Sequence, residues 1–401
     1  MSISPQNKQI YLDNAAATPV DPRVIQEVVR GSKLTGNPSS YNDAGRIAAQ
    51  ELAKGRLAVA RFLGAQVDEI IFTASGSEAN ALALRGVAGA YGGQGRVLLT
   101  AATEHLSVLQ NTRVLEKEGM TTAFIPVDQY GKIKPADIIK AISSKTLIIS
   151  LMYANNEIGT IHPIAAIGKI ITKWRKENNS LFPLFHVDAC QAAGYLPLNV
   201  NQLGVDLLSF NGSKIYGPRG TGVLYVRRGI KINPLVVGGG QEYGRRAGTE
   251  NLPGVMGLAK AITCISKNDG LKVAQLRDYF FKKVQAILPD AGVNGPQGSD
   301  RLANNINISF PNLESEYILL ELDKVGIRAG SGSACTARSV EPSHVLKATG
   351  TPEQYLHGAI RLSLGKTTKK SDLDYTLKVL PVIVRRLNRR FKRSFHNPLS
   401  R

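Results

Sequence analysis

Between about residues 68 and 226, short apolar runs alternate with longer stretches of helical pattern. The runs are rich in Val, Ile, Leu and Phe, as expected for strands that are buried on both faces of a sheet. They read DEIIFTA, RVLLTAAT, TTAFIPVD, TLIISLMYAN, LFPLFHVDA, VDLLSF and TGVLYVRR. Strands that alternate with helices predict a mainly parallel sheet covered by helices. Ligands of such sheets bind beyond the carboxyl ends of the strands, so functional residues are expected there.

The texture of the sequence changes near residue 265. An amphipathic helical stretch, a strand (NINISF), a second helix (SEYILLELDKVG), another strand (AIRLSLG) and a long final helix follow. The chain has 401 residues, and a single hydrophobic core stops growing at roughly 250–300 residues. We therefore predict an α/β fold with a large domain over residues 15–265, built on a mainly parallel seven-stranded sheet. Residues 1–14 and 266–401 are predicted to form a smaller α+β domain.

Composition excludes several other classes of protein. With 43% hydrophobic and 20% charged residues, the chain matches a soluble globular protein rather than a disordered or fibrous one. No apolar run reaches the ~20 residues that cross a bilayer, and the opening segment lacks the apolar core of a signal peptide. We therefore expect a cytoplasmic protein. The cysteines are scattered, at Cys190, Cys264 and Cys335, which argues against a disulfide framework and against a clustered metal site.

The chain is strongly basic, because 50 Lys and Arg residues against 31 Asp and Glu residues give a net charge of +19. Basic residues occur throughout and concentrate only near the C-terminus, at Arg385, Arg386, Arg389, Arg390, Lys392 and Arg393. Such a cluster indicates either a solvated helix face or a surface for an anionic partner, such as a nucleic acid or an acidic protein.

One helix start has the features of a phosphate site. The strand that ends at Ala74 runs into SGSEANALALRGVAGAY, where Ser75 and Glu78 have the spacing of a capping box. The free backbone N–H groups of Gly76 and Ser77, together with the Ser77 hydroxyl, would bind a phosphate at the helix N-terminus. Simple helix capping explains the same residues, so this feature alone leaves both interpretations open.

Two further strand ends carry the other parts of a cofactor site. The strand LFHVDA brings Asp188 to its carboxyl end, with Gln191 shortly after it, and the next strand is followed by NGSKIYGPRG, which contains Lys214. A pyridoxal 5'-phosphate (PLP) site needs a lysine for a Schiff base, an acid beside the pyridine nitrogen and a helix N-terminus for the phosphate. All of these parts occur in order along the chain.

Motifs spread over nearly the whole chain resemble those of the cysteine desulfurases. The motifs are YLDNAAATP, GNPSS, TEH, NNEIG, HVDACQ, SKIYGPRG, RAGTEN and SGSACT. Cysteine desulfurases are PLP enzymes of fold type I that supply sulfur for iron–sulfur clusters and tRNA thiolation. The resemblance implies that L-cysteine is converted to L-alanine, with the sulfur passed to an enzyme cysteine and then to an acceptor or scaffold protein.

The resemblance also implies roles for residues at the cofactor. Lys214 resembles the Schiff-base lysine, Asp188 the acid at the pyridine nitrogen, and Gln191 the hydrogen-bond donor to the ring hydroxyl. His105 resembles the imidazole that stacks on the ring and takes part in proton transfer. Ser77 takes the place of a phosphate-binding threonine and keeps its hydroxyl.

Other residues are placed by the same resemblance at the substrate and at a subunit boundary. Arg361 resembles the arginine that binds the substrate carboxylate, a task suited to a bidentate guanidinium. Asn156 corresponds to an asparagine near the cofactor ring and the substrate, and Asn14 is expected beside the substrate. Thr249 resembles a residue that reaches the phosphate of the neighbouring subunit, which implies a homodimer. From the residues alone, Arg361 is as readily a salt-bridged strand arginine and Asn156 a turn residue.

The sequence departs from the family next to the lysine. Where the family has Ser-x-His-Lys, this chain has Asn211, Gly212 and Ser213 before Lys214. The side chains of Asn211 and Ser213 can still form hydrogen bonds. We therefore expect both residues to bind the phosphate in the absence of the imidazole.

Cys335 is the expected sulfur acceptor. It lies in RAGSGSACTARSVEP, a stretch with too little bulk for a core, and its SGSAC segment resembles that of the desulfurases with a longer loop. A thiolate there would attack the sulfur of bound cysteine, after Lys214 has removed the Cα proton. Cys190 and Cys264 are expected to pack in the interior, although Cys190 is close enough to Asp188 in sequence to line the site.

Two other classes of function remain open at this point. A selenocysteine lyase, a cysteine sulfinate desulfinase or a related PLP aminotransferase would share the cofactor residues, but the SGSAC segment argues against these enzymes. A basic scaffold that binds RNA or a sulfur-carrier protein would keep only the fold. Against a scaffold stands the retention of Lys214, Asp188, Gln191, Arg361 and Cys335.

Overall fold

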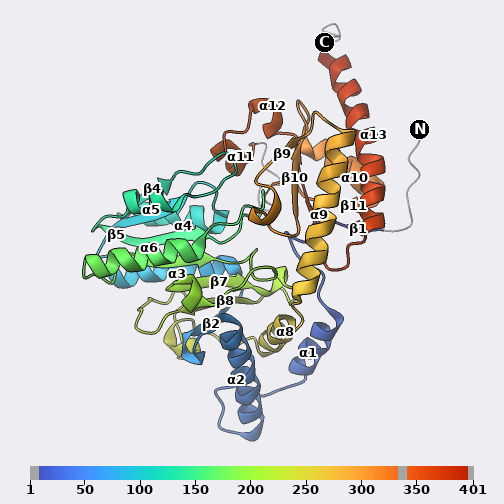
Figure 1. Ribbon diagram of the computed structural model, residues 1–401. Coiled ribbons are helices and arrows are strands. Elements are labelled where there is room, and N and C mark those ends of the chain that lie inside the picture. The colour runs from blue at the N-terminus through green and yellow to red at the C-terminus, as the bar shows by residue number, and fades with distance from the viewer. Residues whose placement is uncertain (1–8, 333–340, 396–401) are drawn as a thin grey trace, which may run out of the picture.

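The computed structural model describes residues 9–332 and 341–395, which form two parts, each with its own sheet (Figure 1). The larger sheet has seven strands in the order β2-β8-β7-β6-β5-β3-β4. In that order the strands span Ile70–Thr73, Gly222–Val226, Leu207–Asn211, Leu184–Asp188, Thr146–Met152, Val97–Ala101 and Thr121–Ile125. Within this sheet β8 alone runs in the direction opposite to the other strands. The predicted mainly parallel, seven-stranded sheet is therefore confirmed.

Helices bury both faces of this sheet. Neighbouring residues of one strand point into different cores: Leu184 packs on the side of α3 and α4, and Phe185 packs on the opposite side. The continuous apolar runs of the sequence follow from this burial on both faces. The helices of this part are α1 (Pro22–Ser32), α2 (Asp43–Leu63), α3 (Gly76–Tyr91), α4 (Leu106–Lys117), α5 (Pro135–Ala141), α6 (Ile164–Glu177), α7 (Val200–Leu203) and α8 (Leu252–Thr263).

The smaller part has an antiparallel sheet in the order β12-β10-β9. A short parallel pair, β1 with β11, joins the start of the chain to this part. Its core combines Ile10 and Leu12 with apolar residues between 273 and 387. The elements are β1 (Ile10–Tyr11), α9 (Lys267–Ile287), β9 (Gly292–Val293), β10 (Asn305–Ser309), α10 (Ser315–Lys324), β11 (Ile327–Arg328), α11 (His344–Ala348), α12 (Glu353–Leu356), β12 (Ala359–Ser363) and α13 (Lys370–Phe395).

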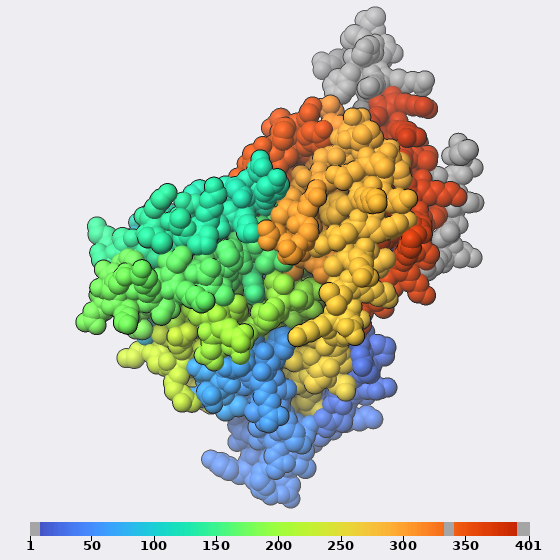
Figure 2. Space-filling view, in the orientation of Figure 1, coloured from blue at the N-terminus to red at the C-terminus, as the bar shows by residue number. Residues whose placement is uncertain are grey.

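The two parts are in direct contact beyond the carboxyl end of β5. Ile161 N donates to Asp300 O (2.9 Å), and Leu302 N donates to Gly159 O (2.8 Å). In Figure 2 the orange C-terminal part accordingly lies against the green segment of the large part. No helix within the described ranges is long and apolar enough to span a bilayer. In the same ranges, no three His, Cys, Asp or Glu side chains are grouped as metal ligands.

A glycine allows β8 to pass close to the start of α3. A Cβ at Gly222 would lie 2.4 Å from Ser75 O and 2.4 Å from Thr73 Oγ1, so a larger residue would push the two segments apart. The N-terminus of α3 is thereby held next to the end of β7.

A buried ion pair ties the segment that leads to Thr249 to the sheet. Arg56 of α2 donates two hydrogen bonds of 2.7 Å to the carboxylate of Glu242, which lies in the short 3-10 helix Gln241–Gly244. Glu242 also accepts a hydrogen bond from Phe72 N (2.9 Å). Both charged side chains are buried.

The replacement Glu242→Ala is expected to lower the free energy of unfolding by about 3–5 kcal/mol, because it leaves the Arg56 charge buried and unpaired. Urea denaturation followed by circular dichroism measures this loss. The control Asp68→Ala removes the carboxylate of an exposed pair with Arg228 and should leave the free energy nearly unchanged. Equal losses in both variants would contradict the prediction.

Candidate active site

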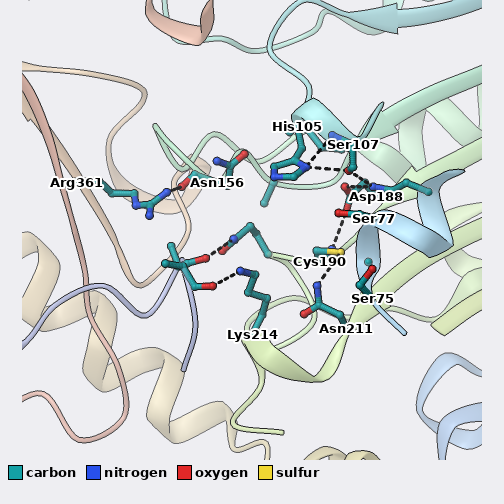
Figure 3. A pocket seen from close by; sticks show the side chains of 17 residues that line it. Ser75, Ser77, His105, Ser107, Asn156, Asp188, Cys190, Asn211, Lys214 and Arg361 are labelled. Atoms are coloured by element: carbon teal, nitrogen blue, oxygen red, sulfur yellow. Dashed lines mark hydrogen bonds between the residues drawn. The ribbon is translucent and has the colours of Figure 1, made fainter. Parts of the chain in front are cut away.

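A cavity of about 200 Å³ opens where the carboxyl ends of β5, β6 and β7 meet the N-terminus of α3 (Figure 3). Motifs that are far apart in the chain meet around this one space. The predicted residues that line it are Gly76, Ser77, His105, Asn156, Asp188, Gln191, Asn211, Lys214 and Arg361.

The carboxylate of Asp188 is held at the end of β6 by two donors. Asp188 Oδ1 accepts a hydrogen bond from Cys190 N (2.9 Å), and Oδ2 accepts one from Asn80 Nδ2 (2.7 Å). The same Asn80 amide donates to Ser107 Oγ (2.8 Å), whereas the buried Asn80 Oδ1 has no hydrogen-bond partner among the described residues. This network keeps Asp188 in one orientation at the edge of the cavity.

Lys214 and Gln191 approach the cavity from two turns and meet the same short segment. Lys214 ends the 3-10 helix that follows β7, and its Nζ donates to Ala16 O. Gln191 Nε2 donates to Ala15 O (3.0 Å). The backbone of residues 15–16 therefore forms one wall of the cavity, opposite the strand ends.

His105 lies at the start of α4, on the far side of the cavity from Lys214 (Figure 3). Its Nδ1 accepts a hydrogen bond from Ser107 N (3.1 Å) and also lies 2.8 Å from Ser107 Oγ. The imidazole is thus fixed by the helix that it caps, and Ser107 links it through Asn80 to Asp188.

The N-terminus of α3 borders the cavity. Ser75 Oγ accepts a hydrogen bond from Glu78 N (3.1 Å), and the Glu78 carboxylate accepts one from Ala74 N (2.8 Å). Gly76 and Ser77 follow this cap and line the cavity. Because the first N–H groups of a helix have no partner within it, capping and anion binding are compatible here rather than alternatives.

The side chains of Cys190 and Asn211 lie against Gly76, the first residue of α3. A Cβ at Gly76 would lie 2.5 Å from Cys190 Sγ and 2.8 Å from Asn211 Nδ2, so this position requires glycine. Asn211 Nδ2 donates to Cys190 Sγ (3.6 Å), and Ser213 Oγ donates to Asn211 Oδ1 (3.1 Å). Burial, reinforced by nearby Asp188, raises the pKa of the Cys190 thiol well above its usual range. Ser213 therefore orients the Asn211 amide, whose NH₂ group lies beside the helix N-terminus and a neutral thiol.

Arg361 is buried in β12 and is held by three separate segments. Its Nη1 donates to Asn156 O (3.0 Å) and Gly332 O (2.7 Å), and its Nη2 donates to Asp13 Oδ1 (3.0 Å). The buried Nε has no hydrogen-bond partner within residues 9–332 and 341–395. A buried donor of this kind needs an acceptor, which a ligand in the cavity can supply.

Three predicted site residues within the described ranges do not line the cavity. Asn14 is buried next to it and donates from Nδ2 to Ser363 O (2.8 Å). Ser213 reaches the cavity only through Asn211. Thr249 is exposed on the surface of this chain. Cys335 lies outside the described residues.

Comparison with protein families identifies the fold. Residues 10–376 match the family model described as aminotransferase class-V. The chain belongs to the class-V aminotransferase family. Within this family it groups with the cysteine desulfurases, and the resemblance of the sequence motifs is confirmed.

Individual relatives match almost end to end. The chain is 45% identical to cysteine desulfurase IscS of Dictyoglomus turgidum, over 95% of this chain and 95% of that protein. A solved NifS-like protein superposes with a TM-score of 0.87 at 33% identity, over 95% of this chain and 100% of that one. The structure of SspA in complex with cysteine has a TM-score of 0.77 at 30% identity, over 90% of this chain and 100% of that one.

PLP is the cofactor of the class-V aminotransferases and of this chain. The residues around the cavity fit it. The same space is bordered by a lysine, by a carboxylate with fixed orientation and by the N-terminus of a helix that begins with glycine. PLP chemistry requires these parts. Gly76 lets the start of α3 lie directly against Cys190 and Asn211 at the edge of the cavity, where the first N–H groups of the helix are available to the phosphate.

Sequence reasoning missed several residues at this site. Asn80 and Ser107 connect Asp188 with His105, and Asp13 pairs with Arg361. Of these residues, Asn80 is the one that the sequence could have revealed. It lies one helical turn after Gly76, on the helix whose N-terminus was predicted to bind a phosphate. Cys190 does line the cavity, as its closeness to Asp188 in sequence allowed.

A buried histidine lies in the sheet directly behind Asp188. His186 precedes Asp188 by two residues on β6, so both side chains leave the same face of the strand. Its ring nitrogens lie 2.8 Å from Ser150 Oγ and 3.0 Å from Ser209 Oγ. Burial lowers the pKa of His186 to about 4, although nearby Asp188 opposes this shift. The imidazole is therefore uncharged at neutral pH.

This histidine predicts acid sensitivity of the fold. The unfolded chain, with a histidine pKa of about 6.5, takes up the proton before the folded chain does. The contribution of His186 to stability is therefore complete above pH 6.5 and is lost as the pH falls from 6.5 towards 4. Relative to pH 7, about 2 kcal/mol should be lost at pH 5.

Urea denaturation of the wild type and of His186→Gln at pH 7 and pH 5 measures this difference. The variant should lose less stability than the wild type over this interval, because glutamine does not titrate. Parallel declines in the two proteins would contradict the assignment.

Proposed function

We propose that this protein is a cysteine desulfurase that converts L-cysteine to L-alanine and passes the sulfur through Cys335 to an acceptor protein. The observation that carries the proposal is the buried guanidinium of Arg361 in the lining of the cavity that Lys214 and Asp188 also line, with an Nε that has no acceptor among the residues that the structure describes. An amino-acid carboxylate suits such a donor. The relatives named above, one of them solved with cysteine bound, support this choice over the related lyases and over a scaffold.

The residues that line the cavity would have different roles at the cofactor. When bound, PLP takes up the electron pair left at the substrate Cα once its proton has departed. Lys214 would hold the cofactor covalently and, when released as an amine, would remove that proton. Asp188, kept in place by Asn80, would hold a proton on the pyridine nitrogen. Gln191, Asn156 and His105 would contact the ring from their places around the cavity.

In the proposed sulfur-transfer step, one bond would form and one would break at the substrate sulfur. The Cys335 thiolate would attack the substrate sulfur, so that a new S–S bond forms and the Cβ–S bond breaks. The electron pair of the broken bond stays on Cβ, which takes up a proton, and Lys214 would return a proton to Cα to give alanine. Gly332, just before the segment with Cys335, already contacts the substrate-binding Arg361. This contact supports the approach of the thiol to the substrate.

The decisive test is the replacement of Cys335. Purified wild type, supplied with L-cysteine and a reductant, should release sulfide and alanine in equal amounts, and Cys335→Ala should retain PLP and release almost no sulfide. Persulfide should be found by mass spectrometry on the Cys335 peptide of the wild type. The control is Cys264→Ala, since Cys264 ends α8 away from the cavity. Full sulfide release by Cys335→Ala would overturn the proposed mechanism.

The phosphate end of the site differs from the family in a testable way. We propose that Asn211 donates to the phosphate, whereas Ser213 acts by orienting Asn211. In a Lys214→Ala background, which removes covalent attachment, Asn211→Ala should raise the dissociation constant for PLP by roughly 10- to 100-fold, as for a lost hydrogen bond to a charged group. Ser213→Ala should raise it by less. Titration of intrinsic fluorescence measures both, and a larger effect of Ser213→Ala would contradict this division.

We propose a homodimer as the working assembly. Thr249 is exposed and outside the cavity of its own chain, so it can meet a phosphate only across a subunit boundary. In the segment that leads to Thr249, two large apolar side chains are also exposed, Val237 at 83% and Tyr243 at 54%. Covering them would favour association.

We propose that the basic end of α13 binds an anionic partner. Arg385 and Arg389 are exposed near the end of this helix. The double variant Arg385→Glu/Arg389→Glu should bind fluorescently labelled tRNA more weakly than the wild type and with a smaller salt dependence. The control Lys169→Glu/Lys176→Glu makes the same charge change on exposed positions of α6. Unchanged affinity for tRNA in the α13 variant would contradict the proposal and would show that the basic end of α13 is a solvated helix face.

A further inference from the structure

The NNEIG motif contains a buried carboxyl group that the proposed chemistry does not use. Glu157 lies in the loop after β5, is 1% exposed and does not line the cavity. The loop is shaped by Asn155, whose Oδ1 accepts hydrogen bonds from Glu157 N and Ile158 N (2.8 Å each). Burial raises the pKa of Glu157 above its usual value. A buried carboxyl group is costly unless it makes specific contacts, so its contacts are informative.

The backbone of Glu157 is fixed to the small part of the molecule. Its carbonyl oxygen accepts hydrogen bonds from Asn305 Nδ2 (2.9 Å) and Asn307 Nδ2 (3.0 Å), both on β10. Gly159 allows this approach, because its φ is 76° and a Cβ there would lie 2.6 Å from Asn305 Oδ1. Glu157 is therefore a fixed point between the two parts.

The side chain of Glu157 contacts both ends of the segment that contains Cys335. On one side, a Cβ at Gly332 would lie 2.8 Å from the Glu157 carboxyl carbon and from Oε2. On the other side, Ser343 lies close enough to the Glu157 carboxyl group to lower its pKa against the effect of burial. Ser343 Oγ accepts hydrogen bonds from Val345 N (3.1 Å) and Leu346 N (3.2 Å), which leaves its hydrogen to donate.

The same region includes the substrate-binding arginine. Gly332 O, whose own residue touches the Glu157 carboxyl group, accepts the 2.7 Å hydrogen bond from Arg361 Nη1. That Nη1 also donates to the carbonyl oxygen of Asn156, the neighbour of Glu157. The position of the substrate carboxylate and the two ends of the Cys335 segment are thus set by one group of contacts.

We propose that Glu157 is a positioning residue for sulfur transfer, which holds Gly332 and Ser343 at a fixed place relative to Arg361. This inference rests on the proposed function. It goes beyond it in assigning a role to a residue that touches neither substrate nor cofactor. Arg361 keeps its hydrogen bonds to Asn156 O and Asp13 Oδ1 when the Glu157 side chain is removed, so the loss of Glu157 should affect sulfur transfer and spare the chemistry at the substrate Cα.

The test separates these two steps in the holoenzyme. Persulfide formation on Cys335 is measured in a single turnover with L-cysteine by rapid quenching and mass spectrometry. Chemistry at Cα is measured by NMR as the exchange of the Cα hydrogen of L-alanine with deuterated solvent, which needs Lys214 but no thiol. Glu157→Ala should slow persulfide formation by about 10- to 100-fold, as a misplaced reactant does. Its hydrogen exchange and PLP content should stay close to wild-type values.

Three further variants keep the result open to refutation. Glu157→Gln has the same length and retains an acceptor for Ser343, so it should restore most of the rate. Gly332→Ala, whose methyl group would displace the Glu157 carboxyl group, should reproduce the Glu157→Ala defect. Glu69→Ala removes another buried carboxyl group, which caps a turn far from the cavity, and should behave as the wild type.

Each outcome has a defined meaning. The inference is overturned if Glu157→Ala forms persulfide at the wild-type rate, if hydrogen exchange falls as far as persulfide formation, or if Glu157→Gln is as slow as Glu157→Ala. A wild type that forms no persulfide on Cys335 would overturn the proposed function itself. Failure of the inference alone is recognised by normal persulfide formation in the wild type.

Discussion

The parallel pairing of β5, β6 and β7 is the constraint on which the site depends. Backbone hydrogen bonds set Met152, Asp188 and Ser209 side by side at one level of the sheet. A sheet that is buried on both faces has room for polar chemistry only where its strands end. The Asp188 carboxylate, the turn with Lys214 and the loop after β5 therefore arrive at one edge, although long helices separate them in the chain.

The sequence predicts a structural feature correctly where the backbone geometry requires a particular type of residue at a particular position. Burial on both faces leaves continuous apolar runs such as TLIISLMYAN, and strand ends reveal Asp188 and Lys214, so the sheet and the centre of the site were predictable. Contacts that depend on side-chain orientation were not predictable from the sequence. Asn80 reaches Asp188 only because α3 packs on the sheet at one particular rotation. The hydrogen bond from Ser213 to Asn211 likewise depends on side-chain torsions that spacing does not specify.

Arg361 shows how one buried cation organises distant parts of a chain. A guanidinium has five N–H donors, and leaving them without acceptors inside a protein is unfavourable. Asp13, Asn156 and Gly332 each supply an acceptor, so the N-terminal segment, the loop after β5 and the stretch after β11 converge on the same group. The position of this guanidinium at the cavity is in this way defined by segments from both parts of the molecule.

The pairing of β1 with β11 has a consequence for the order in which the protein is made. Ile10 lies opposite Ile327, and Leu12 packs among side chains from the last third of the chain. At about 5–20 residues per second, a ribosome needs roughly 15 to 60 seconds to reach residue 327 after it has passed residue 10. During this interval the first strand waits without its partner while the large sheet is completed. Arg361 emerges later still, so newly made chains contain the strand ends around Asp188 and Lys214 before they contain the arginine that lines the same cavity.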